Sequence, residues 1–167
     1  MTTDEIKLSR TERFVRSHIQ HYDEKKYWAR REKVISGTKN PVAGFVNRLR
    51  LLYIKRCDAF NNASLGTHMG FGASFDGIPN LPHGLYGIIV SHNAKIGKNC
   101  TIFHQVTIGE GKGGAPVIGD NVLIGAGAKI IGHVRIGNGA RIGVNAVIVH
   151  DVPDGAVVVA MEGVTIK

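Results

Sequence analysis

The sequence of 167 residues contains few residues of the types that mark secreted or membrane proteins. It has only two cysteines, Cys57 and Cys100, which form neither a disulfide framework nor a CxxC metal pair, so we expect both to be reduced packing residues. No stretch approaches the ~20 apolar residues that span a bilayer, and residues 1–9 lack the apolar run of a signal peptide. We therefore expect a cytoplasmic protein without an integral membrane segment.

Acidic residues are also scarce, and glycine is rare in the first third of the chain. The net charge of +8 comes from residues 1–60, which hold 14 Lys and Arg against 7 Asp and Glu. Only Gly37 and Gly44 of the 22 glycines lie in that segment. Because the basic residues alternate with acidic and apolar ones, we do not expect a nucleic-acid-binding arm. Composition thus divides the chain into residues 1–60 and residues 61–167.

The first segment has the apolar spacing of helices. The clearest pattern follows Asn40 and Pro41, which suit an N-cap and the first position of a helix. We expect residues 1–60 to form a helical segment that packs against the first coils of the second domain. That packing would bury Phe45, Leu49 and Leu52.

From Val90 onward the aliphatic residues recur every six positions, with a single spacing of ten. A period of six is a hexapeptide repeat, which is typical of a parallel β-helix in which three hexapeptides form one triangular coil of 18 residues. The spacing of Leu65-Gly66 and Phe71-Gly72 suggests that the coils begin near residue 62, whereas residues 73–89 look irregular. The repeated aliphatic residues are Val90, Ile96, Ile102, Ile108, Ile118, Ile124, Ile130, Ile136, Ile142 and Ile148.

Four additional residues fall between Ile108 and Ile118, within the glycine-rich stretch 109–116. We expect this stretch to project from the coil. It is either a tolerated surface insertion or a loop that borders a substrate, and its spacing is not that of a phosphate-binding P-loop.

Several segments in this order and spacing resemble the serine acetyltransferase branch of the hexapeptide acyltransferases, which includes bacterial enzymes that O-acetylate capsular or other surface carbohydrates. The resemblance covers about residues 58–160. It implies a mainly β fold, a left-handed parallel β-helix, and a homotrimer that binds acetyl-CoA between neighbouring prisms. The segments are Asn61-Asn62-Ala63-Ser64-Leu65-Gly66, Pro82-His83-Gly84, Gly87-Ile88-Ile89-Val90, Ala94-Lys95-Ile96-Gly97, His104-Gln105-Val106-Thr107-Ile108-Gly109 and Ile124-Gly125-Ala126-Gly127-Ala128-Lys129-Ile130.

Acetyl transfer to an alcohol is helped by a base that removes the hydroxyl proton, and histidine suits this task. Among eight histidines, His83 matches the family's catalytic histidine, with His104 as the second candidate. The resemblance makes Asp58 the carboxylate that orients His83. About ten inserted residues separate the two segments, however, and Asp76 is the alternative.

The resemblance also assigns the cofactor positions. Ala126 and Val144, one coil apart, match the small residues along which the pantetheine lies, and Gly109 matches the glycine at the entrance to the cleft. Three basic residues, Lys129, Arg135 and Arg141, either meet the CoA phosphates or are solvated charges on outer faces.

Two departures from serine acetyltransferases concern the acceptor. Pro82 replaces the aspartate before the catalytic histidine, and residues 114–117 replace an Arg-His pair, so the charged groups of free serine would lack partners. We therefore expect an acetyl-CoA-dependent O-acetyltransferase of a carbohydrate hydroxyl, with serine O-acetylation as the alternative. A non-catalytic trimeric β-helix scaffold is the alternative of another class. No metal is expected, since the histidine spacings lack the close ligand pair of zinc β-helix hydratases.

Overall fold

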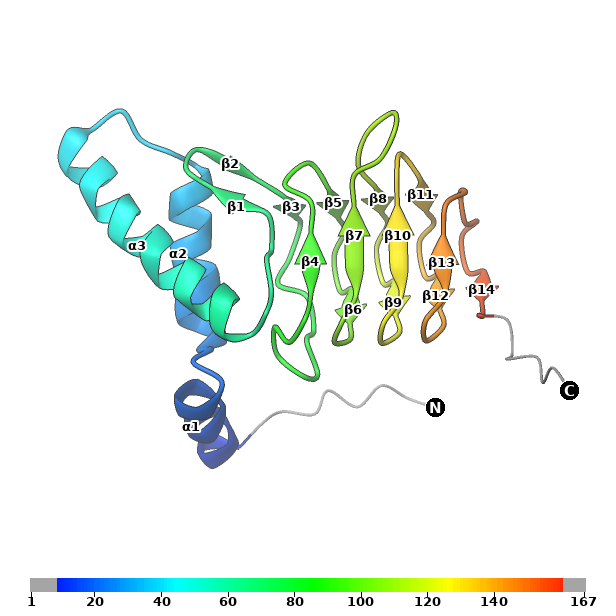
Figure 1. Cartoon of the computed structure of the whole chain (residues 1–167), viewed down its shortest axis with the longest axis horizontal. Helices are drawn as coiled ribbons and strands as arrows, with labels where there is room; N and C mark the ends of the chain where they lie inside the picture. The colour runs from blue at the N-terminus through cyan, green and yellow to red at the C-terminus, as the bar shows by residue number, and fades with distance from the viewer. Residues whose placement is uncertain (1–8, 161–167) are drawn as a thin grey trace, which may run out of the picture.

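The computed structural model describes residues 9–160 as three helices followed by fourteen short strands. The outer limits of the two expected domains, residues 1 and 167, lie outside the described residues. Helices α1 (Arg10–Ile19), α2 (Glu24–Ile35) and α3 (Pro41–Phe60) gather at one end, and the strands form a stack of coils that extends away from them (Figure 1). Within residues 9–160, none of the helices has the length and apolar character needed to cross a bilayer.

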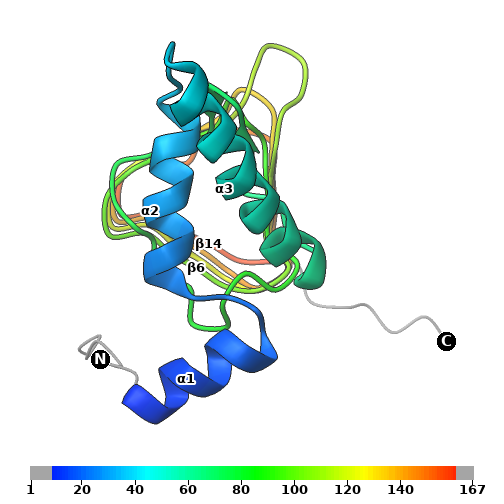
Figure 2. The same cartoon turned by 90° about the vertical axis from the view of Figure 1, so that its left-hand side faces the viewer.

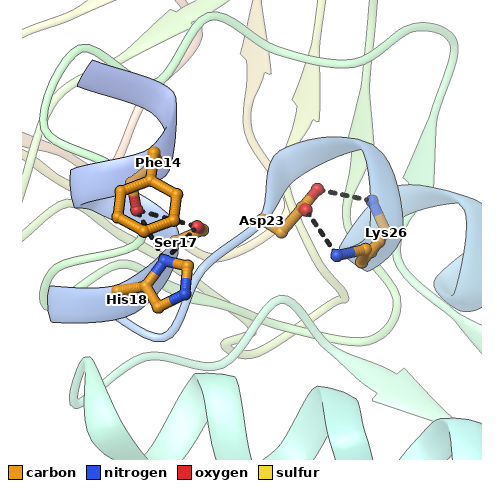
Figure 3. A network of polar contacts seen from close by, with 5 residues as sticks. All are labelled: Phe14, Ser17, His18, Asp23 and Lys26. Atoms are coloured by element: carbon orange, nitrogen blue, oxygen red, sulfur yellow. Dashed lines mark hydrogen bonds and ion pairs between the residues drawn. The ribbon is translucent and has the colours of Figure 1, made fainter. Parts of the chain in front are cut away.

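Side-chain caps fix where the second and third helices begin. Asp23 accepts a hydrogen bond from the Lys26 amide at 3.0 Å, and its other oxygen lies 3.1 Å from the Lys26 ammonium (Figure 3). Asn40 accepts hydrogen bonds from the first amides of α3, and Pro41 follows it as the first helical residue. The predicted helix start at Asn40-Pro41 is therefore confirmed.

The coils form a left-handed parallel β-helix with three four-stranded parallel sheets, as predicted. We name each face after one of its strands: the β7 face holds β4, β7, β10 and β13; the β8 face holds β3, β5, β8 and β11; and the β9 face holds β6, β9, β12 and β14. The strands are β1 (Thr67–His68), β2 (Phe71–Gly72), β3 (Ser74–Phe75), β4 (Ile89–Val90), β5 (Lys95–Ile96), β6 (Thr101–Ile102), β7 (Thr107–Gly109), β8 (Val117–Ile118), β9 (Leu123–Ile124), β10 (Lys129–Ile131), β11 (Arg135–Ile136), β12 (Arg141–Ile142), β13 (Val147–Ile148) and β14 (Val157–Val158).

The repeated aliphatic residues fill the inside of the prism. On the β7 face, for example, Val90, Ile108, Ile130 and Ile148 stand in register in successive coils, and all four are buried. Each such side chain contributes about 1.5–3 kcal/mol when it is removed from water. The hexapeptide period therefore predicted the core of this domain correctly. Both cysteines are free and buried, as expected.

The first coil differs from the prediction. Leu65 is buried, but Phe71 is exposed, because β1 and β2 pair as an antiparallel hairpin rather than as repeats of the coil. The stretch 73–89 is also less irregular than expected, since Ser74–Phe75 forms β3 in the β8 face and Asn80 bridges to Thr101.

Helix α2 closes the end of the β-helix, as predicted for the first segment. Its Arg31 is buried and donates hydrogen bonds to the Thr67 hydroxyl and to the carbonyls of Leu65 and Ala73. Figure 2 shows α2 and α3 lying across the end of the coil stack. Arg31 thus satisfies backbone groups that the end of a coil would otherwise leave without partners.

The prediction that Phe45, Leu49 and Leu52 are buried is wrong for this chain, because all three side chains are exposed. Helix α3 packs with its opposite side, and its buried residues include Asn47 and Ile54. The apolar pattern correctly indicated a helix but not which of its two apolar sides faces the core.

Candidate active site

The candidate site lies at the corner of the prism between the β9 face and the β7 face. Here the corner residue of each coil accepts, through its backbone carbonyl, a hydrogen bond from a backbone amide of the next coil. That amide belongs to the residue directly after the corner residue of the next coil. These bonds join Gln105 to Tyr86, Gly127 to His104 and Asn145 to Ala126. We call Tyr86, His104, Ala126 and Val144 the corner column.

Each member of the corner column precedes a residue with left-handed backbone. The φ angles are 66° at Gly87, 59° at Gln105, 72° at Gly127 and 57° at Asn145. Glycine and asparagine adopt this conformation readily, but glutamine does so at a cost. The Lys129 ammonium donates a hydrogen bond to the Gln105 carbonyl at 2.7 Å, which helps to hold this strained corner.

His83 reaches this corner through an insertion in the first coil. Thr101 lies 21 residues after its partner Asn80, but Thr107 lies only 18 after its partner Ile89, so three additional residues fall between Asn80 and Ile89. His83 is within that interval and precedes Gly84, whose φ is 67°. The three additional residues therefore bring His83 next to the corner column, which a coil of regular length would not do.

The rings of His83 and His104 lie side by side. Their centroids are 4.8 Å apart and the rings are nearly perpendicular, at 86°, while the Phe103 ring lies 5.9 Å from that of His83. His83 is exposed and His104 is half-buried. The Nδ1 atom of His104 is buried and has no hydrogen-bond partner among the described residues. The two histidines that the sequence singled out thus meet at one corner.

The predicted orienting carboxylate does not contact His83 through any hydrogen bond or ion pair in the described part of the chain. Asp58 is buried on α3, where its Oδ1 atom accepts a 2.7 Å hydrogen bond from the Tyr27 hydroxyl. Asp76, the alternative, follows β3 at the corner between the β8 and β9 faces, whereas His83 precedes the β7 face. The orienting role of Asp58 therefore stays a prediction.

The Asp58 carboxyl has an unusual electrostatic environment. Burial raises its pKa from the ordinary 3.8 to about 6, although the Tyr27 hydrogen bond and the charges of Lys55 and Arg31 act in the opposite direction. Its Oδ2 atom is buried and has no hydrogen-bond partner within residues 9–160.

The predicted cofactor positions border the β7 face. Ala126 and Val144 stand in successive coils of the corner column, and Val144 exposes 60% of its surface. Gly109 ends β7 at the other edge of that face, and a Cβ atom there would lie 2.8 Å from the Ile131 side chain. The three positions thus share one face with the histidine pair. Val144 makes its part of the face bulkier than an alanine would.

The glycine-rich insertion projects from the coil stack between β7 and β8, as predicted (Figure 1). Gly111 and Gly114 exchange backbone hydrogen bonds and form a tight hairpin. Glu110 accepts hydrogen bonds from the Ser91 hydroxyl and the Asn93 side-chain amide, and so ties the base of the loop to the preceding coil. The loop therefore borders the edge of the β7 face that carries Gly109.

The three basic residues considered for CoA phosphates lie on three different faces. Lys129 is on the β7 face, Arg135 on the β8 face and Arg141 on the β9 face. Among them, only Lys129 lies on the face that carries the candidate site.

Two residues of the site were not predicted from the sequence. Tyr86 heads the corner column and is exposed, and Phe103 packs beside His83. The only signal for either was its position next to a recognised motif. Within residues 9–160, no group of three or more His, Cys, Asp or Glu side chains is placed to hold a metal ion.

Comparisons with known proteins agree with the fold and with the repeat. The family described as "Bacterial transferase hexapeptide (six repeats)" matches residues 115–150. A serine acetyltransferase from Mycobacterium tuberculosis is 47% identical over 81 residues, which are 46% of this chain and 35% of the relative.

Solved structures extend the likeness to the helices. The serine complex of soybean serine acetyltransferase is 31% identical with a TM-score of 0.63, over 81% of this chain and 54% of that chain. Neisseria gonorrhoeae serine acetyltransferase is 26% identical with a TM-score of 0.69, over 94% and 59%. The chain spans about a third to a half of the curated relatives that it matches. Residues 115–150 therefore carry the bacterial transferase hexapeptide repeat, and the β-helix as a whole is similar in sequence and fold to that of serine acetyltransferases.

Proposed function

We propose that this protein is an acetyl-CoA-dependent O-acetyltransferase in which His83 is the general base. The observation that carries the proposal is the meeting of His83 and His104 at the head of a column that continues through Ala126 and Val144. A base and the two predicted cofactor positions then share one corner of the prism. The names of the relatives support the same chemistry.

The proposed reaction is a direct transfer. An imidazole nitrogen of His83 takes the proton of the acceptor hydroxyl as its oxygen attacks the thioester carbonyl carbon. The carbon–sulfur bond then breaks, and the CoA sulfur leaves with the proton that His83 returns. Neither cysteine takes part, since Cys57 and Cys100 are both buried, and burial raises the pKa of both thiols.

Acetyl-CoA would lie along the β7 face, with its pantetheine against Ala126 and Val144 and its entry beside Gly109. On a single chain this face is open, and His83 and Val144 are exposed. A neighbouring prism would turn the open face into a cleft and exclude water. The proposal therefore includes a homotrimer.

The orientation of His83 involves one of two groups. Asp58 remains a candidate, but it accepts a hydrogen bond from Tyr27 in this structure. His104 is already beside His83, and its buried Nδ1 atom lacks a partner within the described residues. Asp58→Asn would lower kcat only if the carboxylate orients the base.

The comparisons favour serine as the acceptor over the carbohydrate expected from the sequence, because the similar proteins are serine acetyltransferases. Serine is therefore the first acceptor to test. A neutral carbohydrate hydroxyl is the second, since aromatic side chains lie at the corner and Pro82 stands where the resemblance expects an aspartate. The ring of Phe103 contacts His83, and Tyr86 heads the column. The ammonium or carboxylate of serine would be costly to bury there without a charged partner.

The test is release of CoA thiol by the full chain from acetyl-CoA, measured with serine and with a panel of nucleotide-linked and lipid-linked sugars. Turnover that requires one acceptor supports the proposal and identifies the acceptor class. An intact assembly that neither binds CoA nor turns over any acceptor would favour a non-catalytic β-helix scaffold instead.

A further inference from the structure

Helix α3 carries an exposed row of large apolar side chains that no described element covers. Val42, Phe45, Leu49 and Leu52 each expose between 54% and 74% of their surface. Their spacing of three, four and three residues is that of the a and d positions of a heptad, which line the seam of a coiled coil. We call these four residues the α3 seam.

The α3 seam is distinct from the side of the helix that holds the fold together. In the same heptad, Asn47 and Ile54 occupy the position opposite the seam, and both are buried. Asn47 donates a hydrogen bond to the Lys33 carbonyl of α2. The helix therefore has one face committed to α2 and the coils and a second apolar face directed outward. An exposed apolar row of this kind marks an interaction surface.

Basic residues flank the seam on both sides. Along one side, a groove of about 480 Å³ lies between α2 and α3 and is lined by Val46 and Leu49 and by four basic residues. Along the other side, Arg48 and Lys55 occupy the heptad position that borders the partner helix in a coiled coil. None of the described residues that line the groove is acidic. The four basic residues are Lys26, Arg30, Lys33 and Arg50.

Arg30 gives the groove a specific feature. Its guanidinium stacks 3.9 Å above the ring of Tyr53, while its buried Nη1 atom has no hydrogen-bond acceptor within the described part of the chain. Because Arg30 also lines the groove, a carboxylate that entered it would meet the positive charge of the guanidinium, and a charge-assisted hydrogen bond is stronger than a neutral one.

We propose that the α3 seam and its groove dock an acidic amphipathic helix of another protein, with apolar side chains on the seam and carboxylates toward Arg30, Lys33 and Arg48. A second copy of this chain fits less well. Helix α3 has four basic residues against one acidic residue, the buried Asp58, so two seams would bring like charges together. The heptad spacing and the groove between two helices match the shape of a helix better than the flat surface of a bilayer.

The test uses the full chain and two synthetic peptides of several heptads, both with Leu at a and d. One peptide has Glu at e and g, and the other has Lys there. We expect the acidic peptide to bind, the basic peptide not to bind, and added salt to weaken the complex. Leu49→Glu should weaken binding about tenfold or more. Arg48→Glu reverses a charge beside the seam without changing any of its apolar residues, and it should also weaken binding of the acidic peptide. Val157→Glu is the matched control, because Val157 is an exposed valine at the opposite end of the β-helix, and it should bind like the wild type.

Four results would overturn the proposal. The first is failure of the acidic peptide to bind, and the second is equal binding of both peptides. The third is a smaller assembly of the Leu49→Glu variant than of the wild type in sedimentation. The fourth is that the chain binds phosphatidylglycerol vesicles but neither peptide. The third would assign the seam to contacts between copies of this chain, and the fourth would assign it to a membrane surface. Circular dichroism of each variant establishes that it is folded. The test is independent of acetyl transfer, so either proposal can fail alone.

Discussion

The rings of His83 and His104 lie 4.8 Å apart and nearly perpendicular, although the residues are 21 positions apart in a fold whose regular coil has 18. The three additional residues between Asn80 and Ile89 account for this relationship, because they let the chain leave the regular path just before the corner column. His83 therefore lies outside the repeat that holds His104. A base on such an insertion can approach a substrate without disturbing the stacked aliphatic core.

The cofactor position at Ala126 can be tested by adding bulk. Ala126→Phe should raise the Kd for acetyl-CoA about tenfold or more, because a large side chain on the corner column would obstruct the pantetheine. Isothermal titration with acetyl-CoA measures this directly. Lys95→Phe, on the exposed side of the β8 face, is the control and should leave the Kd unchanged. Equal effects of the two substitutions would place the cofactor elsewhere.

The raised pKa of Asp58 predicts a pH-dependent stability. Between pH values of about 4 and 6, the folded chain binds the Asp58 proton more tightly than the unfolded chain does, so the free energy of unfolding falls as the pH rises through this range. The Asp58→Asn substitution removes this pH-dependent loss of stability, and the asparagine side chain can still accept a hydrogen bond from Tyr27. The variant should melt a few degrees higher than the wild type at pH 7 and at about the same temperature at pH 4.

Thermal denaturation at the two pH values checks this prediction. Asp76→Asn, the same change at an exposed carboxylate, should alter neither melting temperature. A gain for Asp58→Asn that is equal at pH 4 and pH 7 would mean that proton binding by Asp58 is not its source.

The close stacking of coils beside the site requires glycine at position 125. A Cβ atom there would lie 2.8–2.9 Å from backbone atoms of Gly143 and Val144. Gly139 has a left-handed φ of 66° but open space around it, so Gly139→Ala should cost only the backbone strain of about 1–2 kcal/mol. Urea denaturation should show a larger loss of stability for Gly125→Ala. The reverse order would show that the coils can separate at this corner without penalty.

The sequence predicted the parts of the fold that depend on local repetition. The six-residue period placed Ile108, Ile130 and Ile148 inside the prism, and Asn40-Pro41 marked the start of α3. The hairpin of β1 and β2 was missed because Leu65 and Phe71 happen to keep the same spacing. That spacing does not distinguish an antiparallel pair from a coil.

The candidate site was predictable only in part, for a related reason. His83 came from a resemblance, but its contact with His104 depends on the length of an irregular insertion, which no repeat specifies. The exposed side of α3 was not foreseen either, because Leu49 and Ile54 are both apolar and the pattern does not say which side faces the core. Asp58 was predicted as a partner of His83, yet the fold gives it Tyr27 as a hydrogen-bond donor.

Steady-state turnover of the His83→Ala variant tests most directly whether His83 is the base. The rate of CoA release should fall by ~10²–10⁴, the usual contribution of a general base. The Kd for acetyl-CoA should stay unchanged, because the predicted cofactor contacts remain. His104→Ala is the paired variant and should lose less activity. If His83→Ala instead turns over near the wild-type rate while His104→Ala is inactive, the base has been assigned to the wrong member of the pair.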